Sequence, residues 1–385
     1  MPQQNSPAAP SFRHQPKAHI QPVFRGCFLG GAVGDALGAP VEFMSRAEIL
    51  KHFGEQGICD YVPAYGRLGA ITDDTQMALF TAEGILRAFV RGKLKGICHP
   101  ASVIAYSYLR WLHTQGLTAP AMRLSHSGWL IEHPELFSQR APGVTCLSAL
   151  QAMTDIGNGS DNDSKGCGGV MRVAPIGMML AGMALRNPAR REEHLLQAFV
   201  LATTAAGITH GHVTGQLTAG AFAAIVFLLL EGKPLREAIA ETLQILAHKP
   251  GHEETTAAIQ KAVELSTESQ ASVDALVSLG EGWIAEEALA IGLYAALCAK
   301  DFESGVIMAV NHDGDSDSTG LIAGHLLGAI HGVESIPDRW LAELELRKVI
   351  EEISDDLASF EDWKLGEDDE VGDESNYYRQ RYPGG

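Results

Sequence analysis

Hydrophobic residues recur at helical spacing along most of this 385-residue chain. From residue 24 to about residue 355, apolar positions repeat every three or four residues, and clusters of Gly, Pro, Asn and Asp separate the repeats. The alternation of apolar and polar residues that is typical of a half-buried strand is hard to find. The pattern predicts an all-α fold, arranged as one compact domain over residues 23–358.

The most apolar run, AGAFAAIVFLLLEG at residues 219–232, predicts a buried helix. It is shorter than the roughly 18 to 20 apolar residues that a membrane span needs. No segment combines the charged start, apolar centre and small-residue cleavage site of a signal peptide. The six cysteines are scattered without a C-x-x-C pair, which favours reduced thiols. We therefore expect a cytoplasmic protein that does not bind membranes.

Both ends of the chain differ from this helical region. Residues 1–22 are rich in proline and poor in large apolar side chains, so we expect a flexible N-terminal arm. Residues 359–385 begin with an acidic stretch and end with aromatic residues and glycine. We expect them to form a solvated acidic tail, because a concentration of like charges opposes packing.

Glycine marks one stripe of the first expected helix. Gly30, Gly34 and Gly38 follow one another every four residues in GGAVGDALG. Each glycine costs a helix about 1 kcal/mol relative to alanine, so three in register predict a neighbouring helix that approaches the backbone closely. The G-x-G-x-x-G spacing of dinucleotide-binding folds is absent, and no strand clearly precedes the stripe.

The charge balance narrows the choice of partner. The chain carries 29 Lys and Arg against 47 Asp and Glu, a formal net charge of −18. Such a surface opposes nonspecific binding of nucleic acid or of anionic lipid. A small substrate or a basic protein partner fits the charge better.

Two acidic clusters lie far apart in the sequence, each at the start of an apolar segment. The first is Thr72, Asp73 and Asp74 in GAITDDTQMALF. Thr72 can cap a helix, and the two aspartates complement the positive end of the helix dipole. The same residues can bind a divalent cation, but a cation needs more oxygen ligands than they supply. A second cluster is therefore expected.

The second cluster lies in NHDGDSDSTG, where Asp313, Asp315 and Asp317 alternate and Ser318 follows. Three carboxylates within five residues repel one another unless cations neutralise them. An EF-hand loop that starts at Asp313 is excluded, because its positions 6 and 12 require Gly and Glu and hold Ser318 and Gly324. Together the two clusters predict a site for two Mg²⁺ or Mn²⁺ ions between two helix N-termini.

These motifs resemble the ADP-ribosylglycohydrolase family, which includes the dinitrogenase reductase-activating glycohydrolases. The resemblance extends from about residue 24 to residue 332 and covers most of the chain. The matching segments are FRGCFLGGAVGDALGAPVEF, TDDTQM, GCGGVMRVAPIG, ITHGHVTG, GWIAEEALAIGLYAAL and NHDGDSDSTGLIAG.

The resemblance implies an all-α fold with a cleft that holds two divalent cations, Mg²⁺ or Mn²⁺, and ADP-ribose. Serine stands at position 318, where the family usually has threonine, and it keeps the hydroxyl oxygen that a cation needs. Asp313 stands where glycine is common, and we expect it to face solvent. The implied metal ligands are Thr72, Asp73, Asp74, Asp315, Asp317 and Ser318.

Other segments are implied to bind substrate. DSKGCGGVMRVAPIG resembles the family's diphosphate loop, in which glycines let backbone amides approach phosphate oxygens. A tight turn before a helix is the structural alternative. His210 is implied to lie near the distal part of the substrate and Glu42 near the catalytic cleft, while core packing is the expected role of Trp283. The implied diphosphate contacts are Ser164, Lys165, Gly166, Gly168 and Gly169, with Cys167 where the family often has asparagine.

The resemblance implies hydrolysis of the N-glycosidic bond between ribose and a protein side chain, with arginine as the expected linkage. Asp73, Asp74 and Glu42 are the candidate catalytic acids. One alternative is a non-catalytic protein that blocks an ADP-ribosyltransferase through residues 1–22, and both roles can coexist in an immunity protein against such a toxin. A metal phosphohydrolase that uses the same carboxylates is a further alternative.

Overall fold

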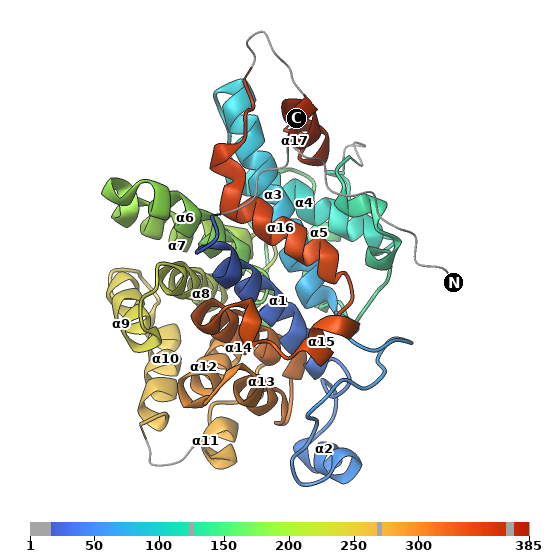
Figure 1. Ribbon diagram of the computed structural model, residues 1–385, viewed down its shortest axis with the longest axis vertical. Helices are drawn as coiled ribbons and strands as arrows, with labels where there is room; N and C mark the ends of the chain where they lie inside the picture. Colours follow the sequence, from blue (N-terminus) through green and yellow to red (C-terminus); the bar gives the residue numbers. More distant parts are fainter. Residues whose placement is uncertain (1–16, 123–126, 268–271, 367–372, 385) are drawn as a thin grey trace.

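The computed structural model describes residues 17–384, apart from 123–126, 268–271 and 367–372 (Figure 1). Within these residues the chain forms α-helices and short 3-10 helices, and it contains no β-strand. The prediction of an all-α fold is confirmed. The α-helices are α1 (Gln21–Gly38), α2 (Arg46–Phe53), α3 (Asp73–Lys95), α4 (Pro100–Thr114), α5 (Val144–Gln151), α6 (Ala174–Arg186), α7 (Arg191–Gly207), α8 (Val213–Leu230), α9 (Leu235–Leu246), α10 (Glu253–Leu265), α11 (Val273–Val277), α12 (Ala285–Cys298), α13 (Phe302–Val310), α14 (Ser316–His331), α15 (Asp338–Glu343), α16 (Arg347–Ser359) and α17 (Asp373–Arg381).

Helices α1 and α14 lie against each other near the centre of the molecule (Figure 1). Their backbones meet through glycines, because a side chain on Gly34 would overlap the carbonyl oxygen of Gly320. In the opposite direction, a Cβ on Gly320 would lie 2.5 Å from the carbonyl oxygen of Gly34. The same close contact between backbones recurs one helical turn away, between Gly30 and Gly324. The close helix contact predicted from the glycine stripe is confirmed.

Helix α8 belongs to the apolar core. Almost all of its side chains are buried, which confirms the prediction of a buried helix. The sequence analysis argued that this apolar run is too short to span a membrane, and that argument was wrong. Helix α8 and the segment Cys167–Arg186 are each long and apolar enough to cross a membrane. In both segments, however, 89% of the most apolar window is buried inside the protein. Such burial is what the core helices of a folded domain show.

The described part of the C-terminal segment packs against the domain, where the sequence predicted a solvated tail. Trp363 stacks on Tyr378 with ring centroids 3.9 Å apart, and on Tyr382 with centroids 5.5 Å apart. All three rings are buried, so the prediction is wrong for these residues. The apolar area of aromatic rings outweighs the acidic charge nearby. At the other end α1 already begins at Gln21, and most of the expected arm, residues 1–16, lies outside the described residues.

Replacing Gly34 with alanine is expected to force α1 away from α14. The new methyl group would meet backbone, which cannot rotate aside, so the free energy of unfolding should fall by about 3 kcal/mol or more. Gly92→Ala in α3 is the matched control, because the nearest atom to its added Cβ would be Cys98 Cβ at 3.8 Å. The control should gain up to about 1 kcal/mol. Urea unfolding measures both changes, and equal stabilities would contradict the close contact.

Candidate active site

The N-termini of α3 and α14 meet at one pocket. Thr72 caps α3, and its hydroxyl oxygen accepts a hydrogen bond from the Asp74 amide at 3.3 Å. Asp315 caps α14 by accepting from the Ser318 amide at 3.4 Å. The Ser318 hydroxyl donates to Asp74 Oδ2 at 2.7 Å, which joins two residues 244 positions apart in the sequence. The structure thus brings the two acidic clusters together.

The pocket between these helix ends has a volume of about 350 Å³. The described residues that line it include no Lys or Arg. Of the predicted site residues, Thr72, Ser164, Lys165 and Gly169 are not part of the lining. The lining consists of Glu42, Phe43, Asp73, Asp74, Ala141, Pro142, Gly143, Val144, Thr145, Cys146, Gly166, Cys167, Gly168, Met171, His210, Trp283, Asp315, Asp317 and Ser318.

Burial makes the carboxyl groups of the pocket difficult to ionise. Asp73 and Asp74 are each 4% exposed, and Asp315 is 2% exposed. Loss of water, followed by repulsion from Asp317, raises the pKa of all three carboxyl groups well above the ordinary range. The same two effects raise the pKa of Glu42 to about 11. A cation in this pocket would therefore meet strongly favourable electrostatics.

Asp35 is a further acidic residue at this site, which the sequence analysis did not identify. It lies on α1, is fully buried, and accepts hydrogen bonds from the Thr72 amide at 3.0 Å and the Thr75 amide at 3.2 Å. Asp35 thus satisfies free amides at the start of α3. Burial, followed by repulsion from Asp317, raises the pKa of Asp35 to about 7. The sequence held one sign of this role, because Asp35 is a carboxylate inside an otherwise apolar, glycine-rich helix.

The donor atoms of the pocket fit a hard divalent cation. Asp315 Oδ2 and Glu42 Oε2 are buried oxygens without a hydrogen-bond partner, and such an oxygen is costly unless something binds it. Carboxylate and hydroxyl oxygens are the ligands that Mg²⁺ and Mn²⁺ prefer. Within the described part of the chain, no group of three or more His, Cys, Asp or Glu side chains is arranged to hold an ion by itself. The carboxylates share the pocket without forming a completed cage.

Gly166, Cys167 and Gly168, in the glycine-rich segment at residues 164–169, form one wall of the pocket. The Cys167 amide donates to the Trp283 carbonyl at 3.1 Å, and the Ala285 amide donates to the Lys165 carbonyl at 2.8 Å. Gly168 leaves no room for a side chain, since an added Cβ would lie 2.7 Å from a buried cysteine sulfur. This wall is therefore fixed to the start of α12 and to the residue Trp283 just before it.

Lys165 is held outside the pocket. Its Nζ donates to Glu254 Oε2 at 2.7 Å and also pairs with Glu286. These carboxylates come from the first turns of α10 and α12. The structure therefore does not bring the Lys165 ammonium group to the position expected for a phosphate contact.

His210 lines the pocket beside the glycine-rich wall. Its Nδ1 shares a hydrogen bond with Thr209 Oγ1 at 2.8 Å. Burial, followed by the positive charge of Arg172, lowers the pKa of His210 to about 3. The imidazole is thus neutral near pH 7, and it offers hydrogen bonding without adding positive charge.

Two expectations about individual residues are wrong. Trp283, expected in the core, is 39% exposed at the pocket and stacks on Phe43. Asp313, expected to face solvent, is half-buried and accepts a hydrogen bond from the Arg46 amide at 2.9 Å, at the start of α2. In both cases the partner is far away in the sequence, so local spacing held no sign of it.

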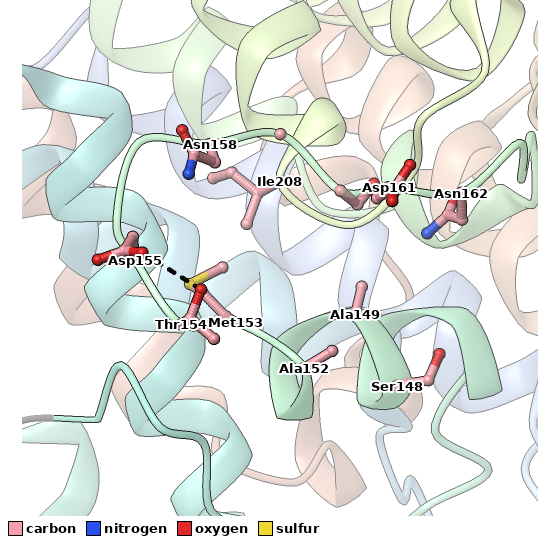
Figure 2. A pocket seen from close by; sticks show the side chains of 12 residues that line it. Ser148, Ala149, Ala152, Met153, Thr154, Asp155, Asn158, Asp161, Asn162 and Ile208 are labelled. Carbon is pink, nitrogen blue, oxygen red and sulfur yellow. Dashed lines mark hydrogen bonds between the residues drawn. The ribbon is translucent and has the colours of Figure 1, made fainter.

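A second pocket, of about 460 Å³, lies between α5 and the loop that follows it. Figure 2 shows Ala149 on the helix and Ala152 directly after its end, with Asp155 and Asn162 on the loop. None of the predicted catalytic or metal-binding residues lines this pocket. The candidate active site is therefore the smaller pocket, because the predicted acidic residues line it.

A divalent cation is expected to stabilise the protein. In the metal-free protein the buried carboxyl groups have pKa values above those of the unfolded chain, which lie near about 4, so the folded state binds more protons. Its free energy of unfolding should fall as the pH rises from about 4 to about 7, the pKa of Asp35. Mn²⁺ at about 100 times its Kd should add about 2.7 kcal/mol.

Urea unfolding across this pH range, with Mn²⁺ or with chelator, measures both effects. The chelated protein is the control for ionic strength when a matching concentration of an inert salt is added. A stability that rises with pH in chelator, or one that Mn²⁺ leaves unchanged, would contradict a cation site in the acidic pocket.

Known proteins resemble this chain over most of its length. Residues 17–365 match the family model for ADP-ribosylglycohydrolase. The ADP-ribosyl-[dinitrogen reductase] glycohydrolase of Rhodospirillum rubrum is 28% identical over 84% of this chain and 90% of that protein. The ADP-ribosylarginine hydrolase Tri1 of Pseudomonas putida is 24% identical over 86% of this chain and 77% of that protein.

A solved structure of an ADP-ribosylglycohydrolase-related protein complex has the same fold. The TM-score is 0.62 and the sequence identity 27%, over 88% of this chain and 98% of that chain. The chain belongs to the ADP-ribosylglycohydrolase family, and it is a hydrolase of ADP-ribose attached to modified substrates.

Proposed function

We propose that this protein is a metal-dependent hydrolase that removes ADP-ribose from arginine side chains of modified proteins. The observation that carries the proposal is the pocket in which the acidic ends of α3 and α14 meet beside a glycine-rich wall. Positively charged side chains are absent from its described lining, which leaves the negative charge for cations. The names of the Rhodospirillum rubrum and Pseudomonas putida relatives support a protein substrate and an arginine linkage.

Two divalent cations, Mg²⁺ or Mn²⁺, are the proposed cofactors. Bound in the pocket, they would supply the positive charge that activates a water and binds ribose hydroxyls. The chemistry of the donor set supports this assignment, since every proposed ligand offers oxygen. The proposed ligands are Thr72, Asp73, Asp74, Asp315, Asp317 and Ser318.

The chain's own carboxyl groups account for proton transfer. Asp73 Oδ2 accepts a hydrogen bond from the Gly143 amide at 3.3 Å, which orients the group, while Asp74 is engaged by Ser318. We therefore assign Asp73 as the base that takes a proton from the attacking water. Glu42 Oε2 is buried at the pocket without a hydrogen-bond partner, so it can hold a proton and give it to the departing nitrogen. The surrounding carboxylates favour the positive charge that develops on ribose.

The wall of the pocket is proposed to bind the rest of ADP-ribose. Gly166 and Gly168 line the pocket and are the proposed diphosphate contacts, with neutral His210 at the distal part. Ser164 Oγ accepts from the Gly166 amide at 3.3 Å, so it shapes the wall. Gly169 lies behind the wall, where an added Cβ would be 3.5 Å from His210 Nδ1.

The alternative functions receive less support. A blocking role for the N-terminal arm depends mainly on residues 1–16, which lie outside the described residues. No observation favours a toxin partner or an immunity role. A metal phosphohydrolase would use the same carboxylates and is separated from the proposal by its product.

Release of ADP-ribose from an arginine-ADP-ribosylated protein tests the proposal. We expect release with Mg²⁺ or Mn²⁺ and none with excess chelator. Release of inorganic phosphate without ADP-ribose would favour the phosphohydrolase. Folded protein that releases neither product in the presence of metal would contradict the proposed function.

Replacing Asp315 with asparagine is expected to abolish most of the hydrolysis. Asparagine still caps a helix, so α14 should keep its start, but the charge for the cations is lost. We expect kcat/KM to fall by more than about 100-fold, because losing a residue that only hydrogen-bonds to a metal ligand costs up to about 100-fold. Asp313→Asn is the matched control, because Asp313 accepts from the Arg46 amide outside the pocket. Equal activities of the two variants would refute the assignment of Asp315.

A further inference from the structure

A pair of exposed aromatic rings stands at the mouth of the acidic pocket. Phe43 and Trp283 stack with ring centroids 6.0 Å apart and ring planes inclined by 18°. Both rings line the pocket, and they are 73% and 39% exposed, whereas the five acidic residues of its lining are at most 6% exposed. The carboxylates therefore form the floor and the aromatic pair part of the rim. Open aromatic faces beside a buried site offer a surface on which a ligand can stack.

The backbone around Trp283 is fixed to the rest of the pocket. Its carbonyl oxygen accepts the hydrogen bond from the Cys167 amide in the glycine-rich wall. A Cβ added to Gly282, just before it, would lie 2.9 Å from Thr319 Cγ2, so this turn packs on the start of α14. The backbone of Trp283 is thus held in place before any substrate arrives.

We propose that Phe43 and Trp283 recognise the guanidinium group of the modified arginine by stacking on it. The inference rests on the proposed function and identifies the residues that select the linkage. A folded protein substrate cannot enter a pocket of about 350 Å³, so its side of the scissile bond stays at the rim. The arginine guanidinium is planar and cationic, and such groups stack on the faces of tryptophan and phenylalanine.

No Lys or Arg side chain belongs to the described lining of the pocket, so the lining brings no positive side chain that would repel a cation at the rim. Glu42 directly precedes Phe43, and four aspartates lie on the floor below. A serine-linked ADP-ribose would place an uncharged, non-planar group at the same position. Only the arginine linkage presents a planar cation to the aromatic faces.

The adenine ring of ADP-ribose is the rival occupant of the aromatic pair. Adenine is planar but uncharged, so it gains the stacking without the attraction between a cation and an aromatic face. It also belongs to the part of the substrate that serine-linked and arginine-linked forms share. A substitution at Trp283 therefore separates the two occupants, because loss of an adenine contact weakens every form of ADP-ribose equally.

The test compares peptides of matched sequence that carry ADP-ribose on arginine or on serine. For wild type, Trp283→Leu and Trp283→Phe, kcat/KM is measured for both peptides, and Kd is measured by calorimetry in chelator. Leucine keeps an apolar side chain without an aromatic face, so Trp283→Leu should lower the preference for the arginine-linked peptide by about 2- to 30-fold. Trp283→Phe should restore most of this preference. Phe43→Leu should act in the same direction as Trp283→Leu.

Phe137→Leu is the control, because Phe137 is also exposed, at 46%, but lies outside the pocket lining. It should leave the preference unchanged. An equal loss for both peptides and for free ADP-ribose in Trp283→Leu would assign the pair to adenine and overturn the inference. If wild type cleaves neither peptide, the proposed function fails, and the Kd values alone decide. Equal Kd values of wild type for the two peptides would then overturn the inference as well.

Discussion

The contact between the backbones of α1 and α14 determines where the acidic residues of the site lie. Glycines at positions such as Gly34 and Gly320 let the two helices touch without intervening side chains. On α1 the same contact positions Asp35, which binds the amides at the start of α3. On α14 it positions Asp315, which caps the helix, and Asp317 and Ser318 in the first turn. One packing interface therefore sets the distances among three helix ends.

The arrangement has an electrostatic cost that the described lining does not offset. The N-termini of α3 and α14 point their partial positive charge at the carboxylates, but this effect amounts to only about half a unit charge per helix. Asp315 Oδ2 and Glu42 Oε2 remain buried without a hydrogen bond. The site is least stable when its carboxyl groups are ionised and no cation is bound. The features that favour cation binding therefore also make the stability of the folded protein depend on cation binding.

The sequence predicted two kinds of feature. Some have a cause within one segment, and one followed because the first acidic cluster supplies too few ligands for a cation. The Gly34 stripe and the Thr72 cap could be read from spacing within one segment, and the meeting of the two acidic clusters followed from the number of ligands that a cation needs. Asp35 and Lys165 could not be placed in this way. Asp35 binds an amide 37 residues away, and Lys165 pairs with Glu254, 89 residues away. Spacing within a segment does not encode such contacts.

The proposed recognition surface and the acidic floor are held by different parts of the fold. Trp283 holds the Cys167 amide through its backbone carbonyl, whereas its ring faces the rim of the pocket. The four aspartates of the floor, in contrast, lie at the N-termini of α3 and α14. A change of the Trp283 side chain can therefore alter what stacks at the rim while the hydrogen bond to the wall and the acidic floor stay in place. Under the proposed assignment, a substitution at the rim therefore changes the preferred linkage without removing the carboxylates of the hydrolytic site.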